Sequence, residues 1–106
     1  MKEIILYNLK DEVSEEQYEA FYRNKKGPTF AAFSSCRSVT LNKVVSAKSG
    51  DIPYRYVAVV EIADPAGWEK DTASGVFQEI IREWGEMVKE GAHILFAEEV
   101  GRWEKK

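Results

Sequence analysis

The chain has 106 residues, of which 44% are hydrophobic and 31% are charged, and its formal net charge is −3. This length and composition are typical of one globular domain, which we place over residues 1–106, and they exclude a disordered segment. The net negative charge gives no electrostatic reason to bind nucleic acid or an anionic membrane. No apolar segment approaches the ~20 residues of a membrane-spanning helix.

The single cysteine and the N-terminal residues limit the class further. Cys36 has no second cysteine with which to form an internal disulfide or a cysteine-based metal cluster. The first twelve residues, MKEIILYNLKDE, carry acids where a signal peptide has small residues, so we expect a cytoplasmic protein.

The first half of the chain predicts a strand followed by an interrupted helix. Residues 3–9, EIILYNL, form a short and mostly apolar strand. Ser14 is the expected N-cap of the helix, and Gln17, three residues later, completes a capping box. Gly27 and Pro28 in the segment NKKGP predict a break or kink, because proline has no backbone N–H. The two lysines of this segment are interpreted as part of a solvated turn.

The second half predicts a strand hairpin, a helical region and a last strand. Residues 34–47 and 54–62 are expected to pair through the turn KSGDIP. Asp64 and Pro65 then start a short helix, residues 76–91 form the clearest amphipathic helix, and AHILFAEEV forms the last strand. Trp84 belongs to the apolar stripe of that helix, where it either packs in the core or forms a wall for a ligand.

The resulting order, β-α-β-β-α-β, predicts the ferredoxin-like α+β fold. Right-handed crossovers place both helices on one face of a four-stranded antiparallel sheet with strand order 4-1-3-2. The strand YRYVAVVEI is apolar on both faces, so one face is left uncovered by helices. We expect an exposed apolar patch there, made of Ile4, Leu6, Ala58, Val60 and Leu95. The simplest cover is a second copy of the chain, which predicts a homodimer.

The segments Y-x-Y-V and DPAGWEKDTAS…FQEIIREWGEMV resemble those of the dimeric α+β barrel superfamily, and most of all the REDY-like proteins. The resemblance spans nearly the whole chain. It implies two ferredoxin-like subunits that pack their sheets into one barrel. It also implies a role in making prodigiosin-type and other pyrrole- or indole-derived pigments. No short catalytic signature comes with it, and the superfamily includes small oxygenases and cyclases that use no cofactor.

Strand adjacency predicts a candidate site at one end of the barrel, formed by His93, Asn8 and Tyr56. His93 is the only histidine and the only side chain whose unperturbed pKa lies near neutrality, so it is the candidate general acid or base. Asn8 and Tyr56 are expected to orient a substrate. Each has a simpler interpretation: a histidine bonded to a backbone carbonyl, an asparagine that caps a turn, and a packing tyrosine.

Further residues are candidates for substrate binding. They are Tyr54, Thr40, Arg37, Leu6 and Leu95. Thr40 can instead be solvated on an edge strand, and Arg37 can form a cross-strand ion pair with Glu61. The lone histidine has no partner at the spacing of metal ligands, so we expect no metal site. The sequence contains no flavin, haem or iron motif, so we expect no cofactor.

Three functions remain open at this point. The first is a cofactor-free enzyme that acts by acid–base chemistry on a hydrophobic aromatic or heterocyclic intermediate, as a cyclase, a hydrolase or a monooxygenase. The second is a binding or carrier protein for the same kind of molecule. The third is a structural dimer whose barrel is filled by side chains.

Overall fold

The computed structural model describes residues 1–106, which form four strands and five helical segments. The strands are β1 (Lys2–Tyr7), β2 (Cys36–Lys43), β3 (Tyr56–Ile62) and β4 (His93–Ala97). The helical segments are α1 (Glu15–Phe21), the π-helical η1 (Tyr22–Lys26), α2 (Gly27–Ala31), α3 (Pro65–Thr72) and α4 (Gly75–Met87). No helix combines the length and the hydrophobicity needed to cross a membrane.

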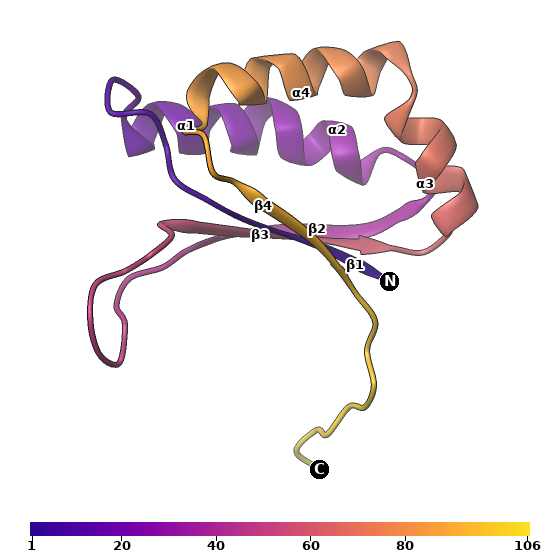
Figure 1. The fold of residues 1–106 in the computed structure, drawn as a ribbon. Helices are drawn as coiled ribbons and strands as arrows, with labels where there is room; N and C mark the ends of the chain where they lie inside the picture. The colour runs from indigo at the N-terminus through magenta and orange to yellow at the C-terminus, as the bar shows by residue number, and fades with distance from the viewer.

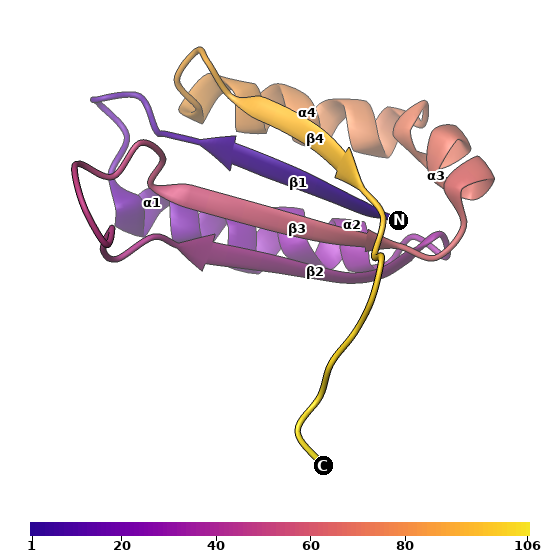
Figure 2. The ribbon, with the colours of Figure 1, turned by 60° about the horizontal axis from the view of Figure 1, so that its bottom comes forward.

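The four strands form one antiparallel sheet in the order β2-β3-β1-β4, which confirms the predicted fold and strand order (Figure 2). The helices lie on one face of this sheet (Figure 1). The loop between β2 and β3 and the C-terminal tail extend away from the helical layer (Figure 1). The helices therefore enclose an interior with one face of the sheet and leave the other face open.

The first helical stretch continues through Gly27 and Pro28, so the predicted break is wrong. Ser14 caps the helix as expected, and its Oγ accepts a bond from the backbone N–H of Gln17 at 3.0 Å. The chain stays helical because the π turn of η1 lies directly before Pro28 and changes the backbone hydrogen-bond pattern there, which accommodates a residue without an N–H. The result is one helical rod with a π-helical segment at its centre.

The π turn decides which side chains of this rod face the sheet. The buried residues are Tyr18, Tyr22, Lys26 and Phe30, at intervals of four. An α-helix has about 3.6 residues per turn, so a strict interval of four drifts around its surface. The wider turn of η1 offsets this drift. All four side chains consequently point to the interior, and one of them is a lysine.

The two faces of β3 are assigned differently from the sequence-based prediction. Tyr56, Ala58 and Val60 are fully buried against the helices, whereas Val57 and Val59 lie on the open face. The placement of Ala58 and Val60 in the exposed patch was therefore wrong. Both faces of this strand are apolar, so alternation along the sequence does not distinguish them.

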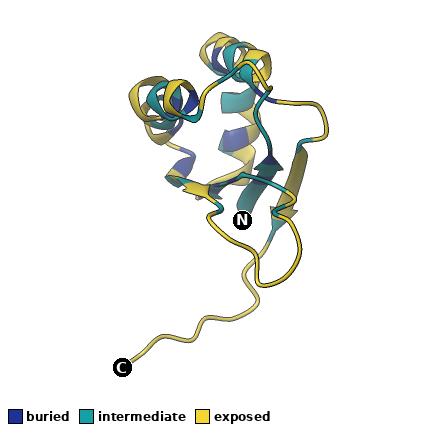
Figure 3. Ribbon diagram, turned by 90° about the vertical axis from the view of Figure 1, so that its left-hand side faces the viewer, coloured by how far each residue is buried: buried dark blue, intermediate teal, exposed yellow.

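The open face instead carries apolar side chains from three strands. Ile4 pairs with Val59 and Leu6 pairs with Val57 across β1 and β3. Leu95 of β4 pairs with Ile4 on the other side and is 50% exposed. Figure 3 shows that burial concentrates between the helices and the sheet, while the loop and the tail are exposed. The predicted existence of an apolar open face is confirmed, with Val57 and Val59 in place of Ala58 and Val60.

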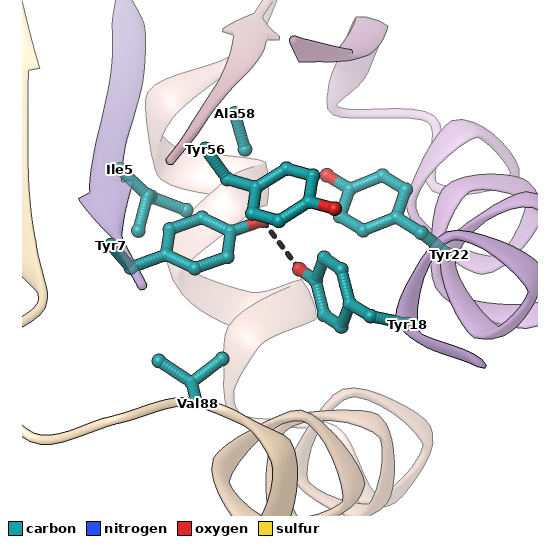
Figure 4. Packing of buried hydrophobic residues seen from close by; sticks show 7 residues of the cluster. All are labelled: Ile5, Tyr7, Tyr18, Tyr22, Tyr56, Ala58 and Val88. Atoms are coloured by element: carbon teal, nitrogen blue, oxygen red, sulfur yellow. Dashed lines mark hydrogen bonds between the residues drawn. The ribbon is translucent and has the colours of Figure 1, made fainter. Parts of the chain in front are cut away.

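Four tyrosines form the centre of one core cluster between the helices and the sheet (Figure 4). The hydroxyls of Tyr7 on β1 and Tyr18 on α1 are hydrogen-bonded. The indole N–H of Trp84 on α4 donates to the Tyr18 hydroxyl at 3.0 Å. One buried oxygen thus ties together the sheet and both helical stretches, and buried polar groups need such partners.

Replacing Tyr18 by phenylalanine should destabilise the protein by about 1–3 kcal/mol, because Tyr7 and Trp84 would each lose a buried hydrogen-bond partner. Urea unfolding followed by circular dichroism measures this loss. Tyr54→Phe is the matched control, since Tyr54 lies outside the core cluster, and it should stay within about 0.5 kcal/mol of the wild type. Equal stability of Tyr18→Phe and the wild type would contradict the role given to this hydroxyl.

Candidate functional site

A cavity of about 830 Å³ opens between the helices and the helix-facing side of β1 and β4. Its walls are mostly apolar, and many of them are aromatic: Phe30, Trp68, Phe77, Trp84 and Phe96. Its polar side chains are Glu3, Lys26, Glu69 and Thr72. Mostly apolar walls with a few polar groups are typical of a small-molecule site.

Lys26 is the chemically unusual member of this lining. Its residue surface is only 1% exposed. Its Nζ lies 4.3 Å from the ring centre of Phe30, 4.9 Å from that of Tyr22 and 5.4 Å from that of Trp84. It makes no side-chain hydrogen bond, and Glu3 is the charged group that acts on it. The amine therefore stands among three rings at the wall of the cavity.

Burial lowers the pKa of Lys26 from 10.5 to about 7, and the attraction of Glu3 opposes part of this shift. The three rings also favour the cation, by roughly 0.5–2 kcal/mol. Removing an ammonium from water costs several kcal/mol, which is the larger effect. Near pH 7, Lys26 is consequently divided between the charged and the neutral amine.

Glu3 lies on the helix-facing side of β1, at the wall of the same cavity. Burial raises the pKa of its carboxyl, whereas Lys26 and the Trp68 side chain lower it in part. The cavity thus joins an amine whose pKa is lowered and a carboxyl whose pKa is raised. Such perturbed titratable groups inside a cleft are characteristic of functional sites.

The structure does not bring the three predicted catalytic residues into one cavity. His93 begins β4 on the open face, opposite Leu6, and its ring meets the ring of Tyr54 edge-on at 5.6 Å. Tyr56 is fully buried on the other face, where its hydroxyl donates to Glu19 at 2.8 Å. The prediction that Tyr56 lines a site with His93 was wrong, because β3 presents Tyr56 to the helices.

Asn8 holds the loop between β2 and β3. Its Nδ2 donates to the carbonyl of Pro53 at 3.0 Å, and its Oδ1 accepts from the N–H of Arg55 at 2.8 Å. Both ends of the amide are therefore engaged by the backbone. This bonding explains a polar residue at the end of an apolar strand.

The predicted substrate-binding residues lie apart from the helix-side cavity. Leu6 and Leu95 lie on the open face, and Tyr54 precedes β3 beside His93. Thr40 is exposed on the edge strand β2, where Asn42 donates to it. Arg37 is exposed at a β-bulge and makes no ion pair with Glu61, so the predicted cross-strand pair is wrong.

Lys26 and Glu3 were missed by the sequence-based prediction. NKKGP was interpreted as a solvated turn, whereas Lys26 is buried inside a continuous helical rod. The signal was present in the interval of four that joins Tyr18, Tyr22 and Phe30, since Lys26 occupies the one remaining position. Trp84 does line the cavity, which agrees with the alternative of a ligand wall.

Residues 1–100 match the family model described as REDY-like protein HapK. The chain belongs to this family. The resemblance inferred from the sequence is thereby confirmed. A search of curated proteins found no match.

Three solved structures are similar to this chain in fold. HapK from Hahella chejuensis is similar with a TM-score of 0.74 and 20% identity, covering 100% of this chain and 99% of that chain. A dimeric ferredoxin-like protein from Thermobifida fusca has a TM-score of 0.67 and 15% identity, over 89% of this chain and 85% of that one. SnoaB, a cofactor-independent oxygenase from Streptomyces nogalater, has a TM-score of 0.68 and 13% identity, over 93% of each chain. These similarities show the ferredoxin-like fold.

Replacing Lys26 by methionine should alter how stability depends on pH between 7 and 9. Lys26 loses its proton near pH 7 in the native state but near 10.5 in the unfolded chain. The unfolded state binds more protons across this range, so the wild type gains up to about 1.4 kcal/mol per pH unit relative to the variant. Urea unfolding at pH 7, 8 and 9 measures the difference between the two proteins.

The matched control is Lys25→Met, which removes the neighbouring lysine from an exposed ion pair with Glu83. It should keep the pH dependence of the wild type between pH 7 and 9. A constant difference in stability between wild type and Lys26→Met over this range would contradict the lowered pKa.

Proposed function

We propose that this protein is a small-molecule enzyme of secondary metabolism that needs no cofactor. It holds a hydrophobic aromatic or heterocyclic intermediate in the helix-side cavity and moves a proton with Lys26. The observation that carries this proposal is the buried amine of Lys26 at the wall of an aromatic cavity. Membership of the REDY-like HapK family supports a role in the synthesis of prodigiosin-type, pyrrole- or indole-derived pigments.

The proton transfer follows from the two perturbed groups. A lysine whose pKa is about 7 supplies a neutral amine near physiological pH, which can act as a base. Once it has taken a proton, the resulting ammonium can act as an acid, because its pKa lies close to the operating pH. Glu3, whose pKa is raised, supplies a carboxyl that can give or take a second proton. The surrounding rings offer apolar faces on which a flat substrate can stack.

Two alternatives keep specific support. A carrier would use the same aromatic walls without chemistry at Lys26. A cofactor-free monooxygenase is favoured by the structural similarity to SnoaB, a cofactor-independent oxygenase. That reaction would require an electron-rich substrate that itself reacts with oxygen.

We also propose that the open sheet face joins two copies of the chain. The apolar residues Ile4, Leu6, Val57, Val59 and Leu95 lie on this face, and no helix covers it. Trp103, on the tail, is 88% exposed and adds a large apolar side chain that a partner can cover. The dimeric ferredoxin-like protein from Thermobifida fusca supports this arrangement. His93 and Tyr54 would then lie at the interface.

Replacing Leu95 by glutamate should shift the protein from dimer to monomer, because a buried unpaired charge at an obligate apolar interface costs several kcal/mol. Light scattering at micromolar concentration measures the mass. Val76→Glu is the control, since Val76 is 62% exposed on α4, and it should leave the dimer intact. A wild-type monomer would overturn the proposed interface.

Narrowing the cavity should weaken ligand binding. With 2-naphthol as the probe, fluorescence of Trp68 and Trp84 should change on binding, in a Trp103→Phe background that removes the exposed tail tryptophan. Ala66→Phe, at the cavity wall, should weaken binding at least about tenfold, or about 1.4 kcal/mol. Ala31→Phe, exposed on α2 outside the cavity, should bind as the parent does.

A chromosomal Lys26→Met variant separates the enzyme from the carrier. Metabolite profiling of the producing organism should show loss of the pathway product and accumulation of its precursor, while the purified variant still binds 2-naphthol. Normal product formation by this variant would favour the carrier. Absence of any 2-naphthol binding by the parent protein would contradict both functions of the cavity.

A further inference from the structure

The amine of Lys26 is a nucleophile that the fold leaves without a hydrogen-bond partner. Rings of Phe30, Tyr22 and Trp84 surround its Nζ at 4.3, 4.9 and 5.4 Å, and no carboxylate forms an ion pair with it. Lys26 is one of the residues that line the cavity of about 830 Å³. A ligand that reaches the nitrogen from the cavity would not have to displace a hydrogen-bonded partner.

The carboxyl of Glu3 belongs to a residue that lines the same cavity as Lys26. Glu3 projects from β1, on the sheet side, whereas Lys26 projects from η1, on the helix side. Burial favours the neutral form of each group. An amine that attacks and a carboxyl that donates a proton are the two groups that imine formation requires.

We propose that Lys26 forms a Schiff base with an aromatic aldehyde bound in the helix-side cavity. This inference rests on the proposed function of the cavity and deepens it by naming the class of substrate. A desolvated lysine in a hydrophobic pocket is the recognised form of an amine nucleophile toward carbonyl compounds.

The chemical step balances without an oxidant or a reductant. The neutral Nζ of Lys26 attacks the aldehyde carbon, a C–N bond forms and the carbonyl π bond breaks. One proton then moves from the nitrogen to the oxygen, which gives a neutral carbinolamine. The Glu3 carboxyl protonates the hydroxyl of this adduct, the C–O bond breaks, and water leaves. The product is an iminium ion whose positive charge replaces that of the ammonium among the same three rings.

The charges in the cavity favour a neutral carbonyl compound over an anion. Glu3 on β1, Glu69 on α3 and Lys26 line it. With Glu3 in its neutral form, Glu69 still repels a ligand carboxylate or phosphate, and the partly neutral amine of Lys26 supplies less than one positive charge to balance it. An uncharged aromatic aldehyde matches the rings of Phe30, Trp68 and Phe77 and presents its one reactive carbon to Lys26.

Reductive trapping tests the proposal. The full-length protein is incubated at pH 7 with 2-naphthaldehyde and sodium cyanoborohydride, and the adduct is located by intact mass and peptide mapping. About half of Lys26 is neutral at this pH, given a pKa of about 7. For an exposed lysine the neutral fraction is roughly one in a few thousand. We expect an adduct at Lys26 that forms at least about tenfold faster than at any other lysine. Peptide mapping separates it from an adduct at the N-terminal amine of Met1, which also reacts with aldehydes.

Two variants and a competitor sharpen the result. Lys26→Met should lose the fast adduct, whereas Lys25→Met should keep it, because Lys25 is exposed and pairs with Glu83. Excess 2-naphthol, which cannot form an imine, should slow trapping in the wild type. Peptide mapping of the wild type decides the question even where a variant does not fold.

Labelling spread evenly over the lysines, or an adduct that persists in folded Lys26→Met, would overturn the proposal. Binding of 2-naphthol without trapping at Lys26 would remove the Schiff base and leave the proposed function standing. Absence of both 2-naphthol binding and trapping at Lys26 would contradict the proposed function of the cavity as well.

Discussion

The interior of this protein depends on the interval of four between buried side chains on one helical rod. Tyr18, Tyr22, Lys26 and Phe30 face the sheet together only because η1 has a wider turn than an α-helix. Tyr18 then bonds to the sheet through Tyr7 and to α4 through Trp84. The π turn that positions the tyrosines of the core also places Lys26 in the interior, so the packing of the core and the burial of the amine depend on the same turn.

Lys26 is costly for a chain of this size. A buried ammonium without an ion-pair partner loses several kcal/mol of hydration, and an apolar residue of similar volume would pack there without that loss. Three rings and the charge of Glu3 offset only part of this cost. Groups that lower stability in this way are expected at functional sites, which separates Lys26 from the surface lysines and from the satisfied amide of Asn8.

The sequence predicted the fold well and the site poorly, for physical reasons. Strand order, helix placement and the Ser14 cap follow from local patterns and from the handedness of crossovers, which do not depend on side-chain detail. The faces of β3 could not be predicted from local patterns, because Tyr56, Ala58 and Val60 are no more apolar as a set than Val57 and Val59. The burial of Lys26 depends on a π turn directly before Gly27 and Pro28, residues that predict a break or kink in the helix.

The assignment of faces on β3 separates two roles within one sheet. Its helix-facing residues, with those of β1, close the interior that contains Lys26 and Glu3, whereas Val57 and Val59 belong to the open face. The residues that line the cavity, Lys26 and Glu3 among them, lie on the helix side of the sheet. A second copy on the open face would therefore add a cover to the sheet without supplying the amine or the carboxyl. Chemistry and association can change independently in such a fold, because a pleated strand sends alternate side chains to opposite faces.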